Sequence, residues 1–411
     1  MIKIKHILLS ALLLSLTSGT IVYVRSTISS KKKILILTSF GGGGNLAASN
    51  ALESYLKNDY DVQSCYAFKE LFTPLDPLNY LTLKRHSGEE FYNWFIPGKY
   101  FRVLGWIYHF GVWYIQMQKK TIHAILRDYF IKTKPDLVIS VIPIINNIVL
   151  DAAQELNIPF LLMPTDLDVN PYIIKIAQPT YKKFYVSLPF DDEEIKAPLK
   201  NSGIPADQTF IIGAPLRTDF FINKNKFRLR KKYVIDSNKP VIMLLMGSHG
   251  SDEMKNYVAE LLKVNTPLHL IACIGKNEQS REDLEKLSIP PHISLTIVGF
   301  TEHIADYMTM SDLFISKSGT LSVCEALYMN LPLLLDATST LLPWEEFNHH
   351  FIKKHNFGDS IKSYDEVAPL VTTIIENSDQ IRTYKNNIQI LEKKNCPKEV
   401  KKLIKHILVT Q

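Results

Sequence analysis

The chain has 411 residues, of which 46% are hydrophobic and 21% charged, and its formal net charge is +6. This length allows two packed domains, and this composition is too apolar for extended disorder. The modest charge, without a dense Arg/Lys tract, argues against a nucleic-acid-binding protein. Four scattered cysteines offer neither a disulfide framework nor metal-ligand spacing, which indicates a reducing compartment.

Residues 1–30 read as a membrane anchor. The run from Ile7 to Val24 is apolar apart from Ser, Thr and one Gly, and its length is near the roughly 20 residues that a spanning helix needs. More basic residues follow this run than precede it, so the positive-inside rule predicts a single-pass anchor with the rest of the chain in the cytoplasm. A cleaved signal peptide is the alternative.

Residues 31–222 predict a first α/β domain. Ile34–Leu37 is a short apolar run, residues 41–44 are a glycine turn, and Leu46–Leu56 has helical spacing. Strand candidates alternate with helical patterns after that, which predicts a parallel, doubly wound sheet. They are residues 137–140, 160–163, 183–186 and 210–212.

Residues 240–380 predict a second domain of the same kind. Residues 223–239 are basic and polar and are interpreted as a linker, and residues 381–411 as a C-terminal basic helix, either solvated or crossing back to the first domain. The predicted fold class is therefore α/β, with two Rossmann-like domains facing a cleft after an N-terminal transmembrane helix, the GT-B arrangement of many glycosyltransferases. Ligands in such sheets bind at the carboxyl ends of strands. The strand candidates of the second domain are residues 241–246, 269–274, 294–298, 313–316 and 333–335.

The glycine loop Gly41–Gly44 lies directly after the first strand candidate and is followed by Asn45. Glycines there allow a ligand to approach amides at a helix start, which makes Gly43 and Gly44 candidates for an acceptor site. The loop lacks the Lys-Ser/Thr ending of a P-loop and the glycine spacing of a dinucleotide fingerprint. A tight packing turn is the alternative.

A second candidate phosphate site joins the strand at residues 313–316 to a helix. Gly319 permits the turn, Thr320 or Ser322 can cap the helix, and the exposed amides would suit a diphosphate. Glu325 would lie one turn inside the helix, where its carboxylate could accept hydrogen bonds from ribose hydroxyls. For an arbitrary helical glutamate, a surface or capping role is the alternative.

Several short motifs occur together in the order found in a known family. The chain resembles the diacylglycerol glycosyltransferases, typified by monogalactosyldiacylglycerol synthase and processive diacylglycerol glucosyltransferases, and the related lipid-linked N-acetylglucosaminyltransferase of peptidoglycan synthesis. The resemblance covers about residues 33–360. Its motifs are the glycine loop, Lys134-Pro135-Asp136, Thr165-Asp166, Gly213-Ala214-Pro215-Leu216-Arg217 through Phe220, Met246-Gly247-Ser248, Val298-Gly299-Phe300, Lys317 through Glu325, and Pro343-Trp344-Glu345 through Asn348.

The resemblance implies roles for individual residues at a UDP-sugar site. It places Gly247 and Ser248 near the donor phosphates, Phe300 near the base, and Glu345 and Asn348 at the sugar. It also implies that the string from Lys317 through Gly319, Thr320 and Ser322 holds the diphosphate and that Glu325 holds the ribose. Trp344 stands where relatives commonly have glutamine, which leaves the donor sugar open.

Asn45 is the main departure, because relatives usually have histidine at the end of the glycine loop. A histidine can accept a proton near neutral pH, whereas an amide is no useful base. Asp166, beyond a predicted strand end, is the preferred candidate for the catalytic base. An Asp that caps a turn or helix is the alternative.

The segment from residue 71 to residue 129 is rich in aromatic residues with interspersed cations. Aromatic rings suit the headgroup layer and cations suit anionic lipid, so the segment is predicted to dock on the membrane and admit a lipid acceptor. Buried core helices are the alternative. The residues assigned to this role are Trp94, Tyr100, Trp106 and Trp113.

The predicted reaction is transfer of a hexose from a UDP-sugar to a lipid hydroxyl, with diacylglycerol as acceptor. Helix-end amides stabilise the departing diphosphate in this fold, so neither a metal nor another cofactor is required. Asp166 and Asp168 have Asp-x-Asp spacing but fall in the presumed acceptor domain. A polyprenyl-linked acceptor and a catalytically silent sugar-nucleotide or lipid sensor are the alternatives.

Overall fold

A computed structural model describes residues 31–41, 43–82, 87–90, 101–247 and 253–409. The fold is that of the compact unit Lys32–Gln411. The predicted anchor, residues 1–30, lies outside the described residues. Among the residues that are described, no helix is both long and apolar enough to cross a membrane.

The first sheet has six parallel strands in the order β2-β1-β3-β4-β5-β6. Ile34 of β1 pairs with Leu137 of β3, and β1, β3 and β4 are buried along most of their length. Helices cover such sheets on both faces, which is why these strands are continuous apolar runs. The strands are β1 Lys33–Thr38, β2 Asp61–Tyr66, β3 Leu137–Ser140, β4 Phe160–Leu162, β5 Phe184–Leu188 and β6 Thr209–Ile211.

The helices of this first domain include one correction to the sequence prediction. The glycine turn is shorter than expected, because α2 begins at Gly43 and so includes Gly43 and Gly44 in its first turn. The helices are α2 Gly43–Leu56, α3 Ala67–Glu70, α4 Pro77–Leu81, α6 Phe101–Met117, α7 Lys119–Thr133, α8 Asn146–Glu155 and α9 Glu193–Asn201, and the short 3-10 helices are η1 Thr73–Leu75, η2 Asn170–Tyr172, η3 Ala206–Gln208 and η4 Thr218–Phe221.

The second sheet also has six parallel strands, in the order β12-β11-β10-β7-β8-β9. The strands are β7 Val241–Leu245, β8 Leu268–Gly275, β9 Ile293–Gly299, β10 Leu313–Ser316, β11 Leu333–Asp336 and β12 Gly358–Ile361. The helices that accompany it are α11 Met254–Leu261, α12 Glu278–Glu285, α13 Ile304–Met310, α14 Thr320–Tyr328, α15 Pro343–Lys354, η5 Tyr364–Glu366 and α16 Val367–Glu376. Two parallel sheets of this kind confirm the predicted pair of Rossmann-like domains.

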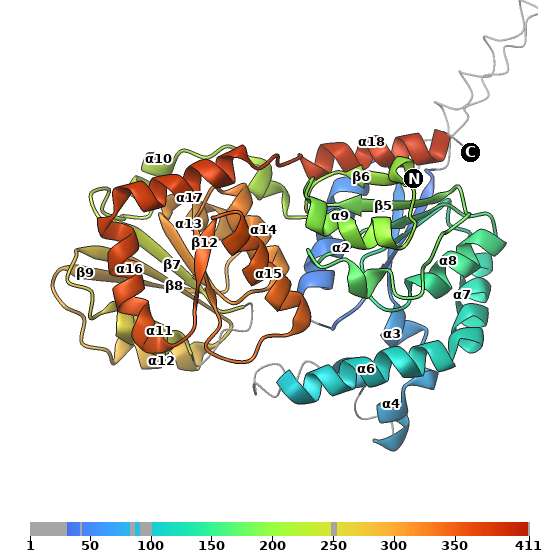
Figure 1. Cartoon of the computed structure of the whole chain (residues 1–411), viewed down its shortest axis with the longest axis horizontal. Helices are drawn as coiled ribbons and strands as arrows, with labels where there is room; N and C mark the ends of the chain where they lie inside the picture. Colours follow the sequence, from blue (N-terminus) through green and yellow to red (C-terminus); the bar gives the residue numbers. More distant parts are fainter. Residues whose placement is uncertain (1–30, 42, 83–86, 91–100, 248–252, 410–411) are drawn as a thin grey trace, which may run out of the picture. The chain divides into compact units, whose positions relative to one another are not determined.

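The predicted linker and the C-terminal region are more structured than expected. Residues 223–239 contain α10, Lys226–Lys232, which packs on α13. The C-terminal region forms two helices, α17 Ser378–Ile390 and α18 Cys396–Val409. The second of these is not merely solvated, since it buries an apolar face and contacts α2 of the first domain (Figure 1).

Strand order reverses beside the first strand of each sheet, and this positions the candidate site. In the second sheet β7 lies between β10 and β8, so Gly247 and Gly319 follow the ends of adjacent strands. In the first sheet β1 lies between β2 and β3, and the glycine loop follows its end. Such reversals open a crevice at the carboxyl edge, where ligands bind.

Candidate functional site

The glycine loop is held by a carboxylate that the sequence analysis did not single out. The backbone amides of Phe40 and Gly41 donate to Oε1 of Glu89, at 3.1 and 3.3 Å. Burial raises the pKa of Glu89, and the two amide hydrogen bonds oppose that rise. These two loop amides are therefore bonded to a carboxylate of the chain itself.

Asn45 is buried in the first turn of α2. Its Nδ2 lies 3.0 Å from Oγ of Ser39 and 3.4 Å from the Gly41 carbonyl oxygen, and its Oδ1 accepts from Thr165 Oγ1 at 2.8 Å. The structure thus brings the two predicted catalytic positions into one network, because Thr165 Oγ1 also contacts the Tyr172 hydroxyl, which in turn contacts Asp166.

Asp166 links the two domains. Its Oδ2 lies 2.8 Å from the Tyr172 hydroxyl, and its Oδ1 accepts a hydrogen bond from Thr320 Oγ1 at 3.0 Å. Burial raises the pKa of Asp166, and the charge of Asp168 acts in the same direction. A carboxylate in this environment can accept a proton more readily than an exposed aspartate, as a general base requires.

Asp168 serves a different purpose. Its Oδ1 accepts from the backbone amide and the side-chain Nδ2 of Asn170, at 3.0 and 2.7 Å, so it caps the turn that leads into η2. Within the described part of the chain, no group of three or more His, Cys, Asp or Glu residues is arranged to hold a metal.

The turn that is predicted to hold the diphosphate lies at the start of α14. Gly319 precedes the helix in an extended conformation, and Thr320 is its first residue. Asn348 of α15 donates to the Ser318 carbonyl at 2.6 Å and to Thr320 Oγ1 at 2.9 Å, which ties the turn to the next helix. The Oδ1 of Asn348 is buried and has no partner among the described residues, so it is available to a hydroxyl donor such as that of a sugar. Ser322 lies on the same first turn and is half-buried.

Glu325 faces a cation from the segment that joins the domains. Its Oε1 lies 4.0 Å from Nη2 of Arg217, whose Nη1 also donates to the Glu302 carbonyl. Burial raises the pKa of Glu325 to about 7, although the positive charge of Arg217 opposes the rise. Arg217 belongs to one of the motifs shared with the family, but the sequence analysis assigned it no role.

Glu345 and Lys317 both have protein partners. Oε2 of Glu345 accepts from the Leu342 amide at 3.0 Å, so the carboxylate caps its own helix, α15, while burial raises its pKa. Nζ of Lys317 lies 3.7 Å from Oε2 of Glu253, at the start of α11. Contacts with the donor are predicted for both side chains, and a bound donor would have to share each of them with its protein partner.

Phe300, which is predicted to lie near the nucleobase, is exposed to solvent. Phe300 is 62% exposed, and Nζ of Lys276 lies 5.1 Å from its ring centroid, a cation–π arrangement that orients the ring. Gly247 has a φ of +84°, which favours glycine, and a Cβ added there would meet no described atom within 4 Å. Ser248 lies outside the described residues.

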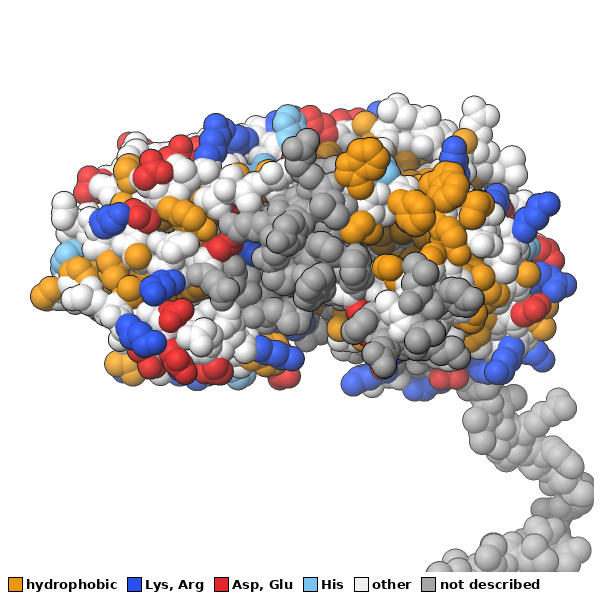
Figure 2. Space-filling view, turned by 90° about the horizontal axis from the view of Figure 1, so that it is seen from below, with side chains coloured by type: hydrophobic (Ala, Val, Ile, Leu, Met, Phe, Trp, Pro, Cys, Tyr) orange, Lys and Arg blue, Asp and Glu red, His pale blue; other side chains and the backbone are white. Residues whose placement is uncertain are grey.

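One face of α6 is exposed and apolar. Trp106 is 81% exposed, and Phe110, Trp113 and Met117 are 57 to 58% exposed. Their spacing of three to four residues places them on a single side of the helix. Figure 2 shows hydrophobic side chains gathered on the face that carries α6. Trp94 and Tyr100 lie outside the described residues, so the structure does not place them.

Comparison with known proteins agrees with this geometry. Residues 241–340 match the glycosyltransferase family 28 C-terminal domain. A processive diacylglycerol beta-glucosyltransferase of Bacillus pumilus (strain SAFR-032) is 23% identical over 389 residues, covering 91% of this chain and 94% of the relative. A protein of the same name from Bacillus cereus (strain B4264) is 27% identical over 310 residues, covering 74% of this chain and 76% of the relative.

The fold is similar to that of MurG from Acinetobacter baumannii. The crystal structure of that protein covers 92% of this chain and 99% of its own, with a TM-score of 0.61 and 15% identity. Together with the sequence relatives, this likeness confirms the GT-B fold and the resemblance that the ordered motifs indicated.

Proposed function

Starting from the family 28 C-terminal domain that makes this chain a glycosyltransferase, we propose that it transfers a hexose, most simply glucose, from a UDP-sugar to the hydroxyl of diacylglycerol. The observation that carries the proposal is the hydrogen bond between Asp166 of the first domain and Thr320 at the start of α14. It joins the candidate base to the candidate diphosphate turn. Two relatives carry the name processive diacylglycerol beta-glucosyltransferase, which gives glucose as the sugar and diacylglycerol as the acceptor for those proteins.

The donor is assigned to the second domain. Amides at the start of α14 would hold the diphosphate, and its helix dipole would favour the negative charge that grows as UDP departs. Glu325 would accept hydrogen bonds from the ribose, and the Oδ1 of Asn348, unpartnered among the described residues, would accept one from the sugar. This chemistry needs no bound metal.

Asp166 is assigned the role of base. The acceptor hydroxyl oxygen forms the new bond to the anomeric carbon while the bond from that carbon to the diphosphate oxygen breaks. The hydroxyl proton passes to the Asp166 carboxylate, and the electron pair leaves with UDP. The carboxamide of Asn45 is no useful proton acceptor, which is why the base is assigned to Asp166.

The acceptor would arrive from a membrane. The exposed aromatic face of α6 would lie in the headgroup layer, where Trp rings are favoured. Residues 1–30 would tether the chain as a single-pass anchor, with both domains on the cytoplasmic side.

The full-length protein in lipid–detergent micelles tests the reaction. UDP-glucose, UDP-galactose and UDP-N-acetylglucosamine are each supplied with diacylglycerol, and both UDP release and glycolipid are followed. We expect glycolipid from the wild type, and a loss of at least a hundredfold in Asp166→Asn and Glu325→Ala. The exposed Asp207→Asn is the matched control. UDP-sugar binding without glycolipid from diacylglycerol would reject this acceptor, and a panel that includes polyprenyl-linked acceptors would then identify another.

Vesicle flotation tests the membrane face. The double variant Trp106→Ser/Trp113→Ser should bind anionic vesicles more weakly than the wild type, because it removes aromatic area from the proposed contact. Ile390→Ser, on α17, removes a side chain that is 80% exposed elsewhere and serves as the control. Equal flotation of the wild type and the double variant would reject α6 as a docking face.

A further inference from the structure

The loops that follow β10 and β11 lie side by side at the carboxyl edge of the second sheet. Ser316 at the end of β10 pairs with Leu335 of β11, so the chain leaves the sheet on two adjacent strands. The first loop leads to Gly319 and α14, where the diphosphate is predicted to bind. The second loop, residues 337–342, follows Asp336 and leads to α15, and it contains none of the predicted UDP-sugar contacts. A ligand bound at the first loop would therefore lie beside the second.

A buried carboxylate fixes the start of this second loop. Oδ1 of Asp336 accepts from the Tyr257 hydroxyl at 2.6 Å and from the backbone amide of Thr338 at 3.0 Å. Asp336 and Tyr257 are both buried, and burial raises the pKa of Tyr257, so the phenol keeps its proton and donates it to the carboxylate. The backbone of Thr338 is thus anchored although it lies outside the sheet.

Two buried side-chain atoms at this edge lack hydrogen-bond partners. Within the described part of the chain, neither the hydroxyl of Thr338 nor Oδ1 of Asn348 has one. The Nδ2 of Asn348 donates to the Ser318 carbonyl at 2.6 Å, and because a carbonyl only accepts, this contact sets the orientation of the carboxamide. Since buried polar atoms are nearly always hydrogen-bonded, the two atoms indicate that a ligand completes the site.

The face of α15 that carries Asn348 lies close to both loops. Asn348 is bonded to Ser318 in the first loop. Glu345 lies one turn earlier on the same face. Burial raises the pKa of Glu345, the charge of Lys317 in the first loop opposes the rise, and the charge of Asp336 before the second loop adds to it. The two unpartnered atoms therefore belong to one region of the site.

The chemistry of these atoms favours sugar hydroxyls over phosphate. Oδ1 of Asn348 can only accept a hydrogen bond, and the oxygens of an ionised diphosphate also only accept, so the diphosphate cannot satisfy it. The hydroxyl of Thr338 can both donate and accept. A hexose presents several hydroxyl groups that do the same, and one such group can serve each of the two side chains.

We propose that Thr338 is a specificity-determining residue for the sugar of the UDP-sugar, and that its hydroxyl forms a hydrogen bond with a hydroxyl group of the hexose. The inference rests on the proposed function, in which the second domain holds the UDP-sugar. Tyr257 and Asp336 are positioning residues, because they act on the sugar only through the backbone of Thr338. A hexose that lacks the contacted hydroxyl leaves the Thr338 hydroxyl unpaired and binds more weakly.

Isothermal titration calorimetry of the full-length protein in detergent micelles, with UDP and UDP-glucose, tests this contact. Thr338→Val removes the hydroxyl and keeps the shape of the side chain. It should lower the affinity for UDP-glucose about fivefold, the effect of one lost neutral hydrogen bond, and leave the affinity for UDP unchanged. Thr338→Ser keeps a hydroxyl and should retain most of the affinity. Thr340→Val makes the same substitution at an exposed position of the same loop and should bind both ligands like the wild type.

Monodeoxy analogues of UDP-glucose identify the contacted hydroxyl. For the analogue that lacks it, the wild type and Thr338→Val should bind equally, because the two changes remove the same hydrogen bond and their effects do not add. For the other analogues, the fivefold difference between the two proteins should persist.

Three results would overturn the inference. An equal loss of affinity for UDP and UDP-glucose in Thr338→Val would show that the residue supports the nucleotide site or the fold. Unchanged affinity for UDP-glucose, or a difference that persists with every analogue, would show that its hydroxyl does not bind the sugar. Any of these results together with glycolipid formation rejects this contact alone. The expected binding pattern without glycolipid formation would instead place the failure in the proposed transfer.

Discussion

Glu325 combines burial with a distant cation, and this makes its charge sensitive to pH. Its carboxylate lies 4.0 Å from Arg217, too far for a strong hydrogen bond, and burial raises its pKa to about 7. Below that pH the acid form dominates. Ribose hydroxyls donate more strongly to a carboxylate than to a neutral acid, so the ionised form is the better donor-binding state.

Affinity for UDP-glucose should therefore rise as the pH increases through about 7. Glu325→Gln should bind about fivefold more weakly at pH 8, the difference between a charged and a neutral hydrogen bond, and should lose the pH dependence. Isothermal titration calorimetry from pH 6 to pH 8 measures both effects. Glu302→Gln changes the same charge at an exposed position and should behave like the wild type. A pH-independent affinity in the wild type would contradict the assigned role of Glu325.

At the scale of the element, sequence pattern predicted every interior strand and missed one of the two edge strands in each sheet. All ten predicted strands exist within two residues of their expected bounds, because buried parallel strands are continuous apolar runs. The missed strands, β2 and β12, lie at sheet edges, where half of each strand is polar and no apolar run forms.

In the candidate site, the sequence motifs located individual residues but not all of their contact partners. The motifs placed Gly319, Thr320 and Glu325 at the start of α14, as found. Glu89 and Arg217 were missed as partners of site residues, because their contacts join segments that are far apart in sequence and no local pattern marks such pairs. Tyr172 was missed although it lies only six residues after Asp166. The capping use of Glu345 could have been recognised, since a glutamate three residues into a helix is the usual partner in a capping box.

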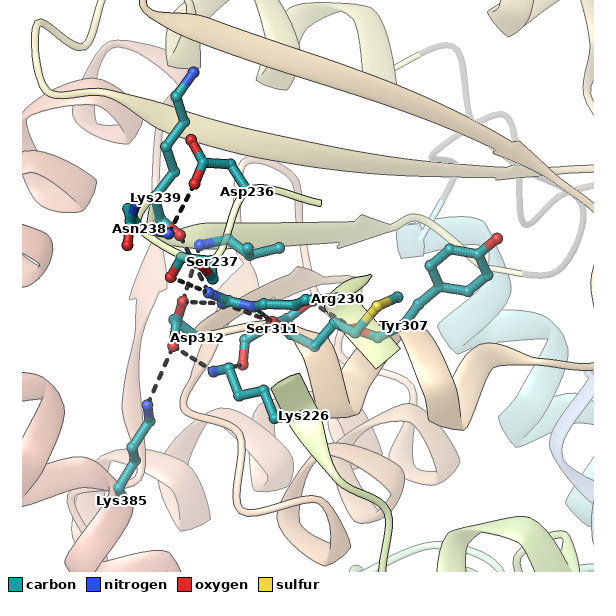
Figure 3. A network of polar contacts seen from close by, with 12 residues as sticks. Lys226, Arg230, Asp236, Ser237, Asn238, Lys239, Tyr307, Ser311, Asp312 and Lys385 are labelled. Atoms are coloured by element: carbon teal, nitrogen blue, oxygen red, sulfur yellow. Dashed lines mark hydrogen bonds and ion pairs between the residues drawn. The ribbon is translucent and has the colours of Figure 1, made fainter. Parts of the chain in front are cut away.

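The basic segment at residues 223–239 is held to the second domain by hydrogen bonds and ion pairs of buried charged side chains (Figure 3). Arg230 of α10 is 5% exposed and donates twice to the Met310 carbonyl, and its Nη2 lies 2.7 Å from Oδ2 of Asp312. Burial opposes ionisation of Asp312, but the charges of Lys226 and Lys385 and the Val241 amide outweigh it and lower its pKa to about 2. The segment interpreted as a linker is therefore part of the second domain's packing.

Arg230→Lys should lower the free energy of unfolding by about 3 kcal/mol, because a lysine cannot serve the carbonyls and the carboxylate together. Asp312→Asn should have a similar cost at pH 7. A lowered pKa contributes stability that is present above the unfolded value near 4 and is lost as pH falls toward about 2, so the gap between wild type and Asp312→Asn should close over that range. Urea unfolding measures both. The exposed Arg228→Lys on the same helix is the control, and an equal loss in that variant would reject the buried network as the cause.

At the scale of the whole molecule, side chains of α9 and α15 join the two domains beyond the site. His355 Nε2 lies 3.0 Å from Oδ2 of Asp192, and Lys354 Nζ lies 2.8 Å from Oε1 of Glu194. Gly213 follows β6 and has a φ of +91°. A Cβ there would lie 2.5 Å from the Lys394 carbonyl oxygen and 2.5 Å from the Tyr328 hydroxyl.

Gly213→Ala should therefore destabilise the protein by about 1–3 kcal/mol, through backbone strain and the displaced connection between α17 and α18. Thermal unfolding should show a lower midpoint. Gly111→Ala on α6, where a Cβ would meet nothing within 4 Å among the described residues, should leave the midpoint unchanged or raise it slightly. A Gly213→Ala protein as stable as the wild type would show that the backbone around residue 213 adjusts with no loss of stability.

The return of α18 to the first domain bears on how the protein is made. Domains usually fold in the order in which the ribosome delivers them. Here α18 buries Val400, Leu403, Ile404 and Ile407 and contacts α2, and Lys401 Nζ lies 2.7 Å from Oδ2 of Asp59. The packing of the domain that is synthesised first is therefore completed only by a helix that is translated after the whole of the second domain. Until then the apolar surface that α18 covers is exposed, and exposed apolar surface on a nascent chain favours chaperone binding.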